Sequence, residues 1–246
     1  MREWSGKRYW LVGASEGLGL SLAQLMSRAG AEVILSARSE DRLAEALATL
    51  PGKGRAVACD VSDAASVRAA AQSVGEVDGV VYLAGVYWPT KTQDWNPDQV
   101  EAMCDINFTG CARVLGAVVP GMVARGKGHV VITGSLSGFR GLPGSIGYTA
   151  SKAGVMSLAE CMYADLRDSG IDVQVANPGF IRTRLTAKND FSMPFLMEPE
   201  GAAREMFEHM NTDTFKKSFP MVFSWVFRLS QFLPDWAYYR LFAPKK

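Results

Sequence analysis

Tyr148 and Lys152 stand four residues apart at the start of a predicted helix, in the run Tyr148-Thr-Ala-Ser-Lys152. A separation of four places two side chains on the same helix face. A phenol has an ordinary pKa of about 10 and exchanges protons poorly at neutral pH, but a neighbouring ammonium stabilises the phenolate and lowers that pKa. We therefore expect Lys152 to activate Tyr148 for proton transfer, although such pairs also occur by chance on many helices.

Ser135 follows a predicted strand over 129–133, at the edge where open α/β sheets bind their ligands. Its hydroxyl can donate to a substrate carbonyl oxygen, and Ser137 is the neighbouring alternative for this role. Hydride addition to a ketone puts negative charge on that oxygen, which a hydrogen-bond donor and a proton-supplying tyrosine would meet. The residues thus predict the interconversion of a ketone and a secondary alcohol.

A glycine-rich turn, Gly13-Ala-Ser15-Glu16-Gly17-Leu18-Gly19, lies between the first predicted strand and a helical pattern. Glycines permit a tight turn and let the backbone approach a pyrophosphate, whose charge is stabilised by N–H groups at a helix N-terminus. The spacing is G-x-x-x-G-x-G and not the G-x-G-x-x-G of longer dehydrogenases. An ordinary strand-to-helix turn is the alternative, but the position after the first strand favours a nucleotide site.

The second predicted strand ends in Ser36-Ala37-Arg38, where many NAD sites have an acid that binds the ribose 2′-hydroxyl. Arg38 could pair with a 2′-phosphate, and Ser36 could hydrogen-bond it. We therefore expect NADP (NADPH) as the cofactor, with NAD less favoured. The alternative is that Arg38 is a solvated residue that opens a loop.

Short β-branched or aromatic runs alternate with longer helical patterns from the start of the chain to about residue 175. This alternation predicts an α/β fold with a doubly wound, Rossmann-type parallel sheet flanked by helices. Pro120 is expected to bend or shorten the longest helix. The predicted strands are 8–12, 32–36, 55–58, 79–83, 129–133 and 172–176, and the predicted helices are 18–28, 39–50, 62–74, 97–125 and 148–169.

Composition excludes several classes of protein. The 246 residues are 48% hydrophobic, which is enough for a full core, and 26 Lys and Arg nearly balance 25 Asp and Glu, so no nucleic-acid binding is expected. Four cysteines without C-x-x-C spacing and two distant histidines do not support a metal site. Without an apolar signal segment or an uninterrupted apolar stretch of about 18 residues, the chain is expected to be cytoplasmic.

These features in their order resemble the short-chain dehydrogenase/reductase family over about residues 7–185. Ser135 lies thirteen residues before Tyr148, and the set is specific although each motif alone is weak. The resemblance rests on the glycine turn, Asp60-Val61 after the third strand, Asn107, Ser135, Tyr148-x-x-x-Lys152 and Pro178-Gly179-Phe-Ile181-Arg-Thr183.

The resemblance implies a role for each matching residue. Tyr148 would be the acid of carbonyl reduction and the base of alcohol oxidation, Ser135 would position the carbonyl, and Lys152 would hold the nicotinamide ribose. Asn107 would support a water that links Lys152 to solvent, although it could instead be a polar residue that bends the helix. The cofactor contacts would further include Asp60 and Val61 at the adenine, Thr183 at the carboxamide, and Ala84, Gly85, Pro178, Gly179 and Ile181.

Two departures from the family accompany this resemblance. The run Tyr82-Leu83-Ala84-Gly85 stands where the family has Asn-Asn-Ala-Gly, so the asparagine that braces the central sheet is missing. The family's glycine-rich last strand, which feeds a dimer contact, is also absent, although 215–219 could still form a seventh strand. A homo-oligomer, dimer or tetramer, is expected.

Residues 214–246 form a basic, aromatic segment that we expect to follow a single domain over 1–213. They hold ten of the 25 aromatic residues and one acid, Asp235, against six cations, Lys216, Lys217, Arg228, Arg240, Lys245 and Lys246. The run 222–233 predicts a short helix with a wide apolar face, and a second helix follows Pro234. Three fates are open: packing on the core or on a partner subunit, docking at the inner face of a membrane, or covering an apolar substrate.

The function expected from these residues is hydride transfer between NADP(H) and an apolar or lipid-like ketone or alcohol. The alternative is an NADP-binding regulatory or membrane-associated scaffolding protein with the same fold and little catalysis. A pure binder would have no chemical need for the set Ser135, Tyr148, Lys152 and Asn107, which favours the enzyme.

Overall fold

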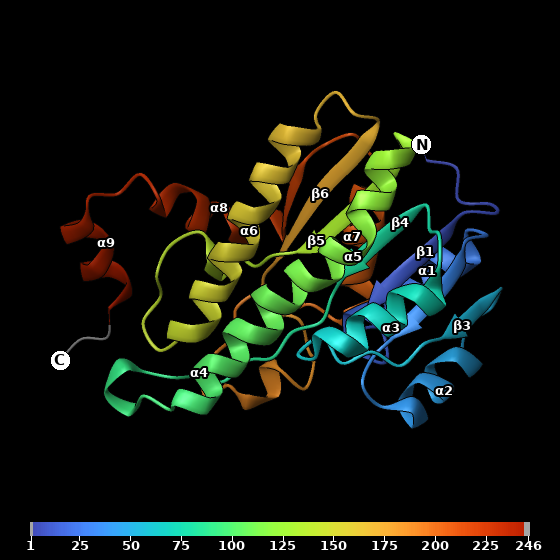
Figure 1. The fold of residues 1–246 in the computed structure, drawn as a ribbon. Helices are drawn as coiled ribbons and strands as arrows, with labels where there is room; N and C mark the ends of the chain where they lie inside the picture. Colours follow the sequence, from blue (N-terminus) through green and yellow to red (C-terminus); the bar gives the residue numbers. More distant parts are fainter. Residues whose placement is uncertain (1, 244–246) are drawn as a thin grey trace.

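The computed structural model describes residues 2–243, and over these residues the chain builds a seven-stranded parallel sheet in the order β3-β2-β1-β4-β5-β6-β7 (Figure 1). β1 lies inside the sheet and the chain winds outward from it in both directions, so the predicted doubly wound α/β sheet is confirmed. The strands are β1 (Arg8–Val12), β2 (Glu32–Ser36), β3 (Gly54–Ala56), β4 (Gly79–Tyr82), β5 (Gly128–Thr133), β6 (Ile171–Pro178) and β7 (Lys216–Phe219).

Helices cover both faces of this sheet. Successive strand residues point to opposite faces, so Trp10 and Val12 pack on one side with α3, α5 and α6, while Tyr9 and Leu11 pack on the other with α1 and α7. Figure 1 shows α3, α5 and α6 in front of the strands. The helices are α1 (Gly17–Arg28), α2 (Glu40–Ala48), α3 (Ala64–Val74), α4 (Pro97–Cys104), α5 (Gly110–Arg125), α6 (Ile146–Leu166), α7 (Pro199–Met210), α8 (Met221–Ser230) and α9 (Asp235–Phe242).

The predicted helix over 97–125 is interrupted, but not at Pro120. A π-helical turn at Asp105–Thr109 separates α4 from α5, and α5 runs on through Pro120 to Arg125. Pro120 deprives the Gly116 carbonyl of its helical partner, but both residues are exposed, so water can satisfy that carbonyl. The same stretch is apolar and long enough to cross a membrane by composition, yet Met103, Cys111 and Val114 are fully buried in this fold.

The C-terminal segment supplies the last strand of the sheet. Lys216–Phe219 pairs in parallel with β6 at the edge of the sheet. The predicted seventh strand is thereby confirmed. Beyond Phe219 the chain continues into α8 and α9, which Figure 1 shows at one end of the molecule.

Two histidines are buried near the amino ends of the central strands, and the ring of one, His129, links three strands. The Tyr9 hydroxyl donates to His129 Nδ1 (3.0 Å), and His129 Nε2 donates to Gln174 Oε1 (2.9 Å). The Gln174 amide in turn donates to the carbonyls of His209 and two further residues. Burial lowers the pKa of His129 to about 3 and that of His209 to about 4, so both rings are neutral at pH 7.

These histidines predict acid-labile stability. In the unfolded chain a histidine pKa is about 6.5. Between pH 6.5 and 4 both rings are therefore protonated in the unfolded state but remain neutral in the folded state. The free energy of unfolding should therefore fall on acidification by up to about 1.4 kcal/mol per pH unit for each ring. Urea unfolding at pH 7 and pH 5 measures this slope. His129→Gln should reduce it, and an unchanged slope in that variant would contradict the assignment.

Candidate functional site

A cleft of about 3070 Å³ opens at the carboxyl edge of the sheet. It is lined by residues at or just after the ends of four neighbouring strands, Gly13, Leu83, Thr133 and Pro178. β1 and β4 flank the point where the winding of the sheet reverses, which is where open α/β sheets bind their ligands. The position of the cleft therefore follows from the topology.

The glycine turn closes one side of the cleft. Gly13 and Gly17 have φ of +92° and +54°, a backbone region that favours glycine. A Cβ on Gly13 would lie 2.4 Å from the Ala84 nitrogen, and one on Gly19 would lie 2.2 Å from the Gly13 oxygen. The backbone can pack this closely only without side chains, and the turn presents the N-terminus of α1 to the cleft, with Ser15, Glu16, Gly17 and Leu18 among the lining residues.

This arrangement fits a dinucleotide. The twelve-residue helix α1 starts without a side-chain cap, so N–H groups of its first turn can receive a pyrophosphate. Deeper in the cleft, the hydroxyls of Thr133 and Thr149 are buried and have no hydrogen-bond partner among residues 2–243. Asp60, Val61, Gly85, Gly179, Ile181 and Thr183, predicted as cofactor contacts, also line the cleft.

Glu16 does not leave an unbalanced charge beside the phosphate position. Its carboxylate accepts a hydrogen bond from Arg184 Nε (2.8 Å), and Arg42 lies 4.0 Å from its second oxygen. The cleft at this point is therefore not a net acidic surface.

Ser36 is not available to a cofactor, in contrast to the prediction. Its hydroxyl is fully buried, accepts a hydrogen bond from Trp10 Nε1 (2.8 Å) and donates to the Val57 carbonyl (2.6 Å). Ser36 is the last residue of β2, and its side chain points between strands rather than into the cleft, so it serves the core.

Arg38 does line the cleft, together with Arg42, which the sequence reasoning missed. Burial raises the pKa of Asp60, but hydrogen bonds from Ser62 and the charge of Arg38 outweigh it and hold the pKa below its usual value. This end of the cleft is thus built from two arginines and one ionised carboxylate. Arg42 follows Arg38 by four residues and could have been found from that spacing.

Ser135 is held by its neighbour Ser137. It caps the short 3₁₀ turn Leu136–Gly138, where its oxygen accepts from the Ser137 backbone nitrogen (3.2 Å) and from the Ser137 hydroxyl (2.9 Å). An oxygen that accepts two hydrogen bonds keeps its own hydrogen free to donate. Of the two serines, Ser135 therefore has the hydroxyl hydrogen that is free to donate into the cleft, and Ser137 orients the Ser135 hydroxyl.

Tyr148 keeps its proton in this structure. Burial raises its pKa to about 12, while the neighbouring Ser135 hydroxyl acts in the opposite direction. Tyr87 packs edge-on against the Tyr148 ring, with the ring centroids 5.0 Å apart. Tyr148 at the cleft wall is thus a neutral phenol at physiological pH.

Lys152 does not lower the pKa of Tyr148, which corrects the prediction from their spacing. The two residues do share a helix face, but Lys152 Nζ lies 5.8 Å from the Tyr148 ring centroid and donates to the Thr133 carbonyl (2.8 Å). At this distance the effect of burial on Tyr148 dominates. Lys152 is itself buried, and burial lowers its pKa to about 8.

Asn107 lies in the π-helical turn and is fully buried. Its Oδ1 accepts from the Val86 nitrogen (2.8 Å), and its Nδ2 donates to the Val86 carbonyl (3.0 Å) and to the Ser151 hydroxyl (3.0 Å). The side chain thereby fixes the segment that follows Ala84 and Gly85 to α6. π-turns recur at functional positions because they redirect a side chain without ending the helix.

Tyr82 supplies a brace where the family's asparagine is missing. Its fully buried ring reaches the π-turn, and its hydroxyl donates to the Ile106 carbonyl (2.5 Å). A Cβ on Gly110 would lie 2.8 Å from this hydroxyl, so a glycine makes room for it. The π-turn and Tyr82 therefore pack against each other and depend on each other.

The remaining lining of the cleft is largely aromatic and aliphatic, with charged side chains such as Arg140, Lys188 and Asp190 among it. Aromatic and aliphatic side chains from separate parts of the chain meet there, and sequence reasoning did not place them together. They are Tyr87, Leu136, Leu142, Phe180, Phe191, Phe223, Phe227, Tyr239 and Phe242. Among residues 2–243 no group of three or more His, Cys, Asp or Glu side chains is arranged to hold a metal ion.

Comparisons with known proteins agree with this geometry. A family model described as short chain dehydrogenase matches residues 7–192. An uncharacterized oxidoreductase of Myxococcus xanthus is 36% identical over 242 residues, which are 96% of this chain and 96% of that protein.

Solved structures are similar over most of the chain. One is a short chain dehydrogenase/reductase family protein with 28% identity and a TM-score of 0.82, covering 88% of this chain and 97% of that one. A short chain dehydrogenase/reductase of Burkholderia phymatum in complex with NAD has a TM-score of 0.86 at 23% identity over 94% of each chain, a likeness of fold.

Proposed function

The chain belongs to the short-chain dehydrogenase/reductase family of oxidoreductases, and from that premise we propose that it interconverts an apolar ketone and its secondary alcohol with NADP(H). The observation that carries the proposal is the meeting of Ser135, Tyr148 and Lys152 in a cleft whose one end suits a dinucleotide and whose remaining lining is largely aromatic and aliphatic.

Each of the three residues has a distinct task in carbonyl reduction. The reduced nicotinamide, when bound, supplies the hydride. Ser135 donates its free hydrogen to the carbonyl oxygen, so charge that develops there is stabilised as it forms. Tyr148, protonated at neutral pH, gives its proton to the same oxygen. In alcohol oxidation the same groups act in reverse.

Lys152 and Asn107 have supporting roles in this chemistry and do not contact the carbonyl. The Lys152 ammonium is charged below about pH 8 and would hold a ribose hydroxyl of the cofactor. Asn107 positions the segment at Val86 against α6 and, in the proposal, a water that relays a proton from solvent through Lys152 to replace the one that Tyr148 has given.

Arg38 and Arg42 favour NADP over NAD. Both line the adenosine end of the cleft, and the position after β2 that would repel a 2′-phosphate if acidic is Arg38. A guanidinium forms strong, charge-assisted hydrogen bonds with phosphate. The proposal of NADP therefore rests on these two side chains.

Arg38→Asp is expected to lower kcat/KM for NADPH by about 100-fold, because it removes a charge-assisted bond and adds a repelling carboxylate. The value for NADH should change far less. Steady-state kinetics with both cofactors measures the ratio. Arg68→Asp, the same change at an exposed site on α3 away from the cleft, is the control. An unaltered preference in Arg38→Asp would remove the 2′-phosphate assignment.

A ketone series tests the substrate class. NADPH oxidation is followed with methyl ketones of increasing chain length and with hydroxylated ketones of the same size. The apolar wall predicts that kcat/KM rises with chain length and falls with added hydroxyls. NADPH binding without turnover of any ketone would instead favour the regulatory, scaffolding alternative.

A further inference from the structure

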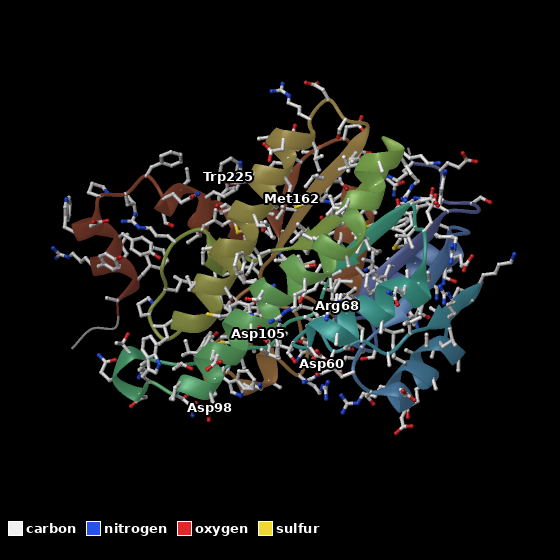
Figure 2. The ribbon with its side chains drawn as sticks, viewed as in Figure 1. Asp60, Arg68, Asp98, Asp105, Met162 and Trp225 are labelled. Carbon is white, nitrogen blue, oxygen red and sulfur yellow. The ribbon has the colours of Figure 1, made fainter. Side chains whose placement is uncertain are left out.

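The outward side of α8 and α9 carries a dense group of exposed apolar side chains, which we call the C-terminal face. Of the fifteen large exposed hydrophobic residues within 2–243, nine belong to it, and Phe232 and Trp236 are 84% and 74% exposed. Figure 1 shows both helices at one end of the molecule, and Figure 2 shows Trp225 on α8 at its periphery. The nine are Met221, Val222, Trp225, Val226, Leu229, Phe232, Trp236, Tyr239 and Leu241.

The inner side of these helices is firmly attached, so the C-terminal face is presented by an ordered structure. Arg140, in the loop that follows Ser135, donates to the carbonyls of Ser230 and Leu233 (both 2.7 Å) and to Asp235 Oδ1 (2.5 Å). Its guanidinium also stacks 4.0 Å from the centroid of the Tyr238 ring. The buried Tyr238 hydroxyl donates to the Gly141 carbonyl (2.7 Å).

The unpaired charges on the C-terminal face have one sign. Arg228 stacks on the Trp225 ring at 4.5 Å, and neither Arg228 nor Arg240 forms an ion pair with any residue of 2–243. The single acid of the two helices, Asp235, is bound to Arg140. The face therefore offers two unpaired arginines, and its one carboxylate, 85% exposed at the side chain, is already paired with Arg140.

This charge pattern discriminates between possible partners. A second copy of the chain related by a two-fold axis would bring the same patch against itself, which adds two more arginines and no unpaired acid. An anionic lipid surface would pair with both arginines, while tryptophan and phenylalanine side chains enter the boundary between headgroups and acyl chains. The observed combination of aromatic residues and unpaired arginines fits the lipid surface.

We infer that the C-terminal face docks on a bilayer surface that contains anionic phospholipids. Its apolar side chains enter the headgroup region, and Arg228 and Arg240 bind lipid phosphates. Phe223 and Phe227 of α8 line the aromatic and aliphatic part of the cleft, so, given the proposed function, docking would bring the substrate entrance to the membrane. Docking itself does not depend on catalysis.

Vesicle co-sedimentation of the full chain tests the inference. Vesicles of phosphatidylcholine alone are compared with vesicles that also contain phosphatidylserine, and we expect binding to the second and far less to the first. Phe232→Ser with Trp236→Ser, and separately Arg228→Glu with Arg240→Glu, should each lower partitioning by about tenfold or more. Val123→Ser on α5 and Arg68→Glu on α3, at exposed positions on helices that do not belong to the face, should leave partitioning unchanged.

Several results would overturn the inference. They are absence of binding to both vesicles, equal binding by wild type and both double variants, or equal loss in the control variants. A dimer in solution that dissociates in Phe232→Ser with Trp236→Ser, without vesicle binding, would assign the face to a contact between copies. Thermal melting and NADPH binding confirm folding, and the arginine pair provides the test if the apolar pair misfolds.

Discussion

Replacing Tyr148 by phenylalanine is expected to slow ketone reduction at neutral pH by about 10³-fold, within the range that a positioned general acid contributes. The reason is that Tyr148 holds its proton, with a pKa raised by burial to about 12, and the variant has no proton to give. Phenylalanine preserves the edge-on contact with the Tyr87 ring, so the wall of the cleft and NADPH affinity should be retained. Single-turnover oxidation of NADPH measures the loss.

The matched control for this variant is Tyr163→Phe, which removes a phenol from the same helix, α6, at an exposed position stacked on Phe215. It should reduce ketone at the wild-type rate. A Tyr148→Phe rate within about tenfold of wild type would refute the assignment, because general acid catalysis contributes at least 10²-fold.

Lys152→Met is expected to lower kcat/KM by about 10²-fold at pH 7 and to change the pH profile. Burial lowers the pKa of Lys152 to about 8, so the side chain is charged below that pH and neutral above it. If the ammonium holds the cofactor, wild-type kcat/KM for reduction should be level below about pH 8 and fall about tenfold per unit above it. That profile reports the free enzyme, the state described here.

The fall of kcat/KM above pH 8 distinguishes cofactor binding by the Lys152 ammonium from a role in packing alone. In Lys152→Met the fall above pH 8 should disappear, because the titrating group is gone. Lys152→Arg keeps a charge at all accessible pH values, so its profile should also be level. If kcat/KM of Lys152→Met still falls above pH 8 as in wild type, another group is responsible for that fall.

The order of strands and helices can be predicted from the sequence, because the spacing of apolar residues and the glycines at turns are local signals. The six strands before β7 were predicted close to their observed bounds, and β7 needed only four residues to join the sheet. The π-turn around Asn107 could not be predicted in this way. It depends on Tyr82 and Val86 approaching from another segment, which a helical pattern does not reveal.

In the candidate site, too, some features could be predicted from local sequence and others depend on contacts between distant segments. Ser135, Tyr148 and Lys152 are brought together because carboxyl ends of parallel strands meet at one edge, so their chain positions suffice. The pKa of Tyr148 was predicted in the wrong direction, since it depends on burial and on where the Lys152 amine points. The contribution of α8 to the apolar wall was left open among three alternatives for the C-terminal segment, because its placement depends on the distant Arg140.

The central claim is that this cleft moves a hydride to a carbonyl carbon while Tyr148 protonates the oxygen. The most direct measurement follows deuterium from C4 of labelled NADPH into the product of an apolar ketone, by mass spectrometry, in wild type and Tyr148→Phe. We predict deuterium on the carbinol carbon with wild type and almost none with the variant in the same time. Unlabelled alcohol, or equal labelling by both proteins, would contradict the account.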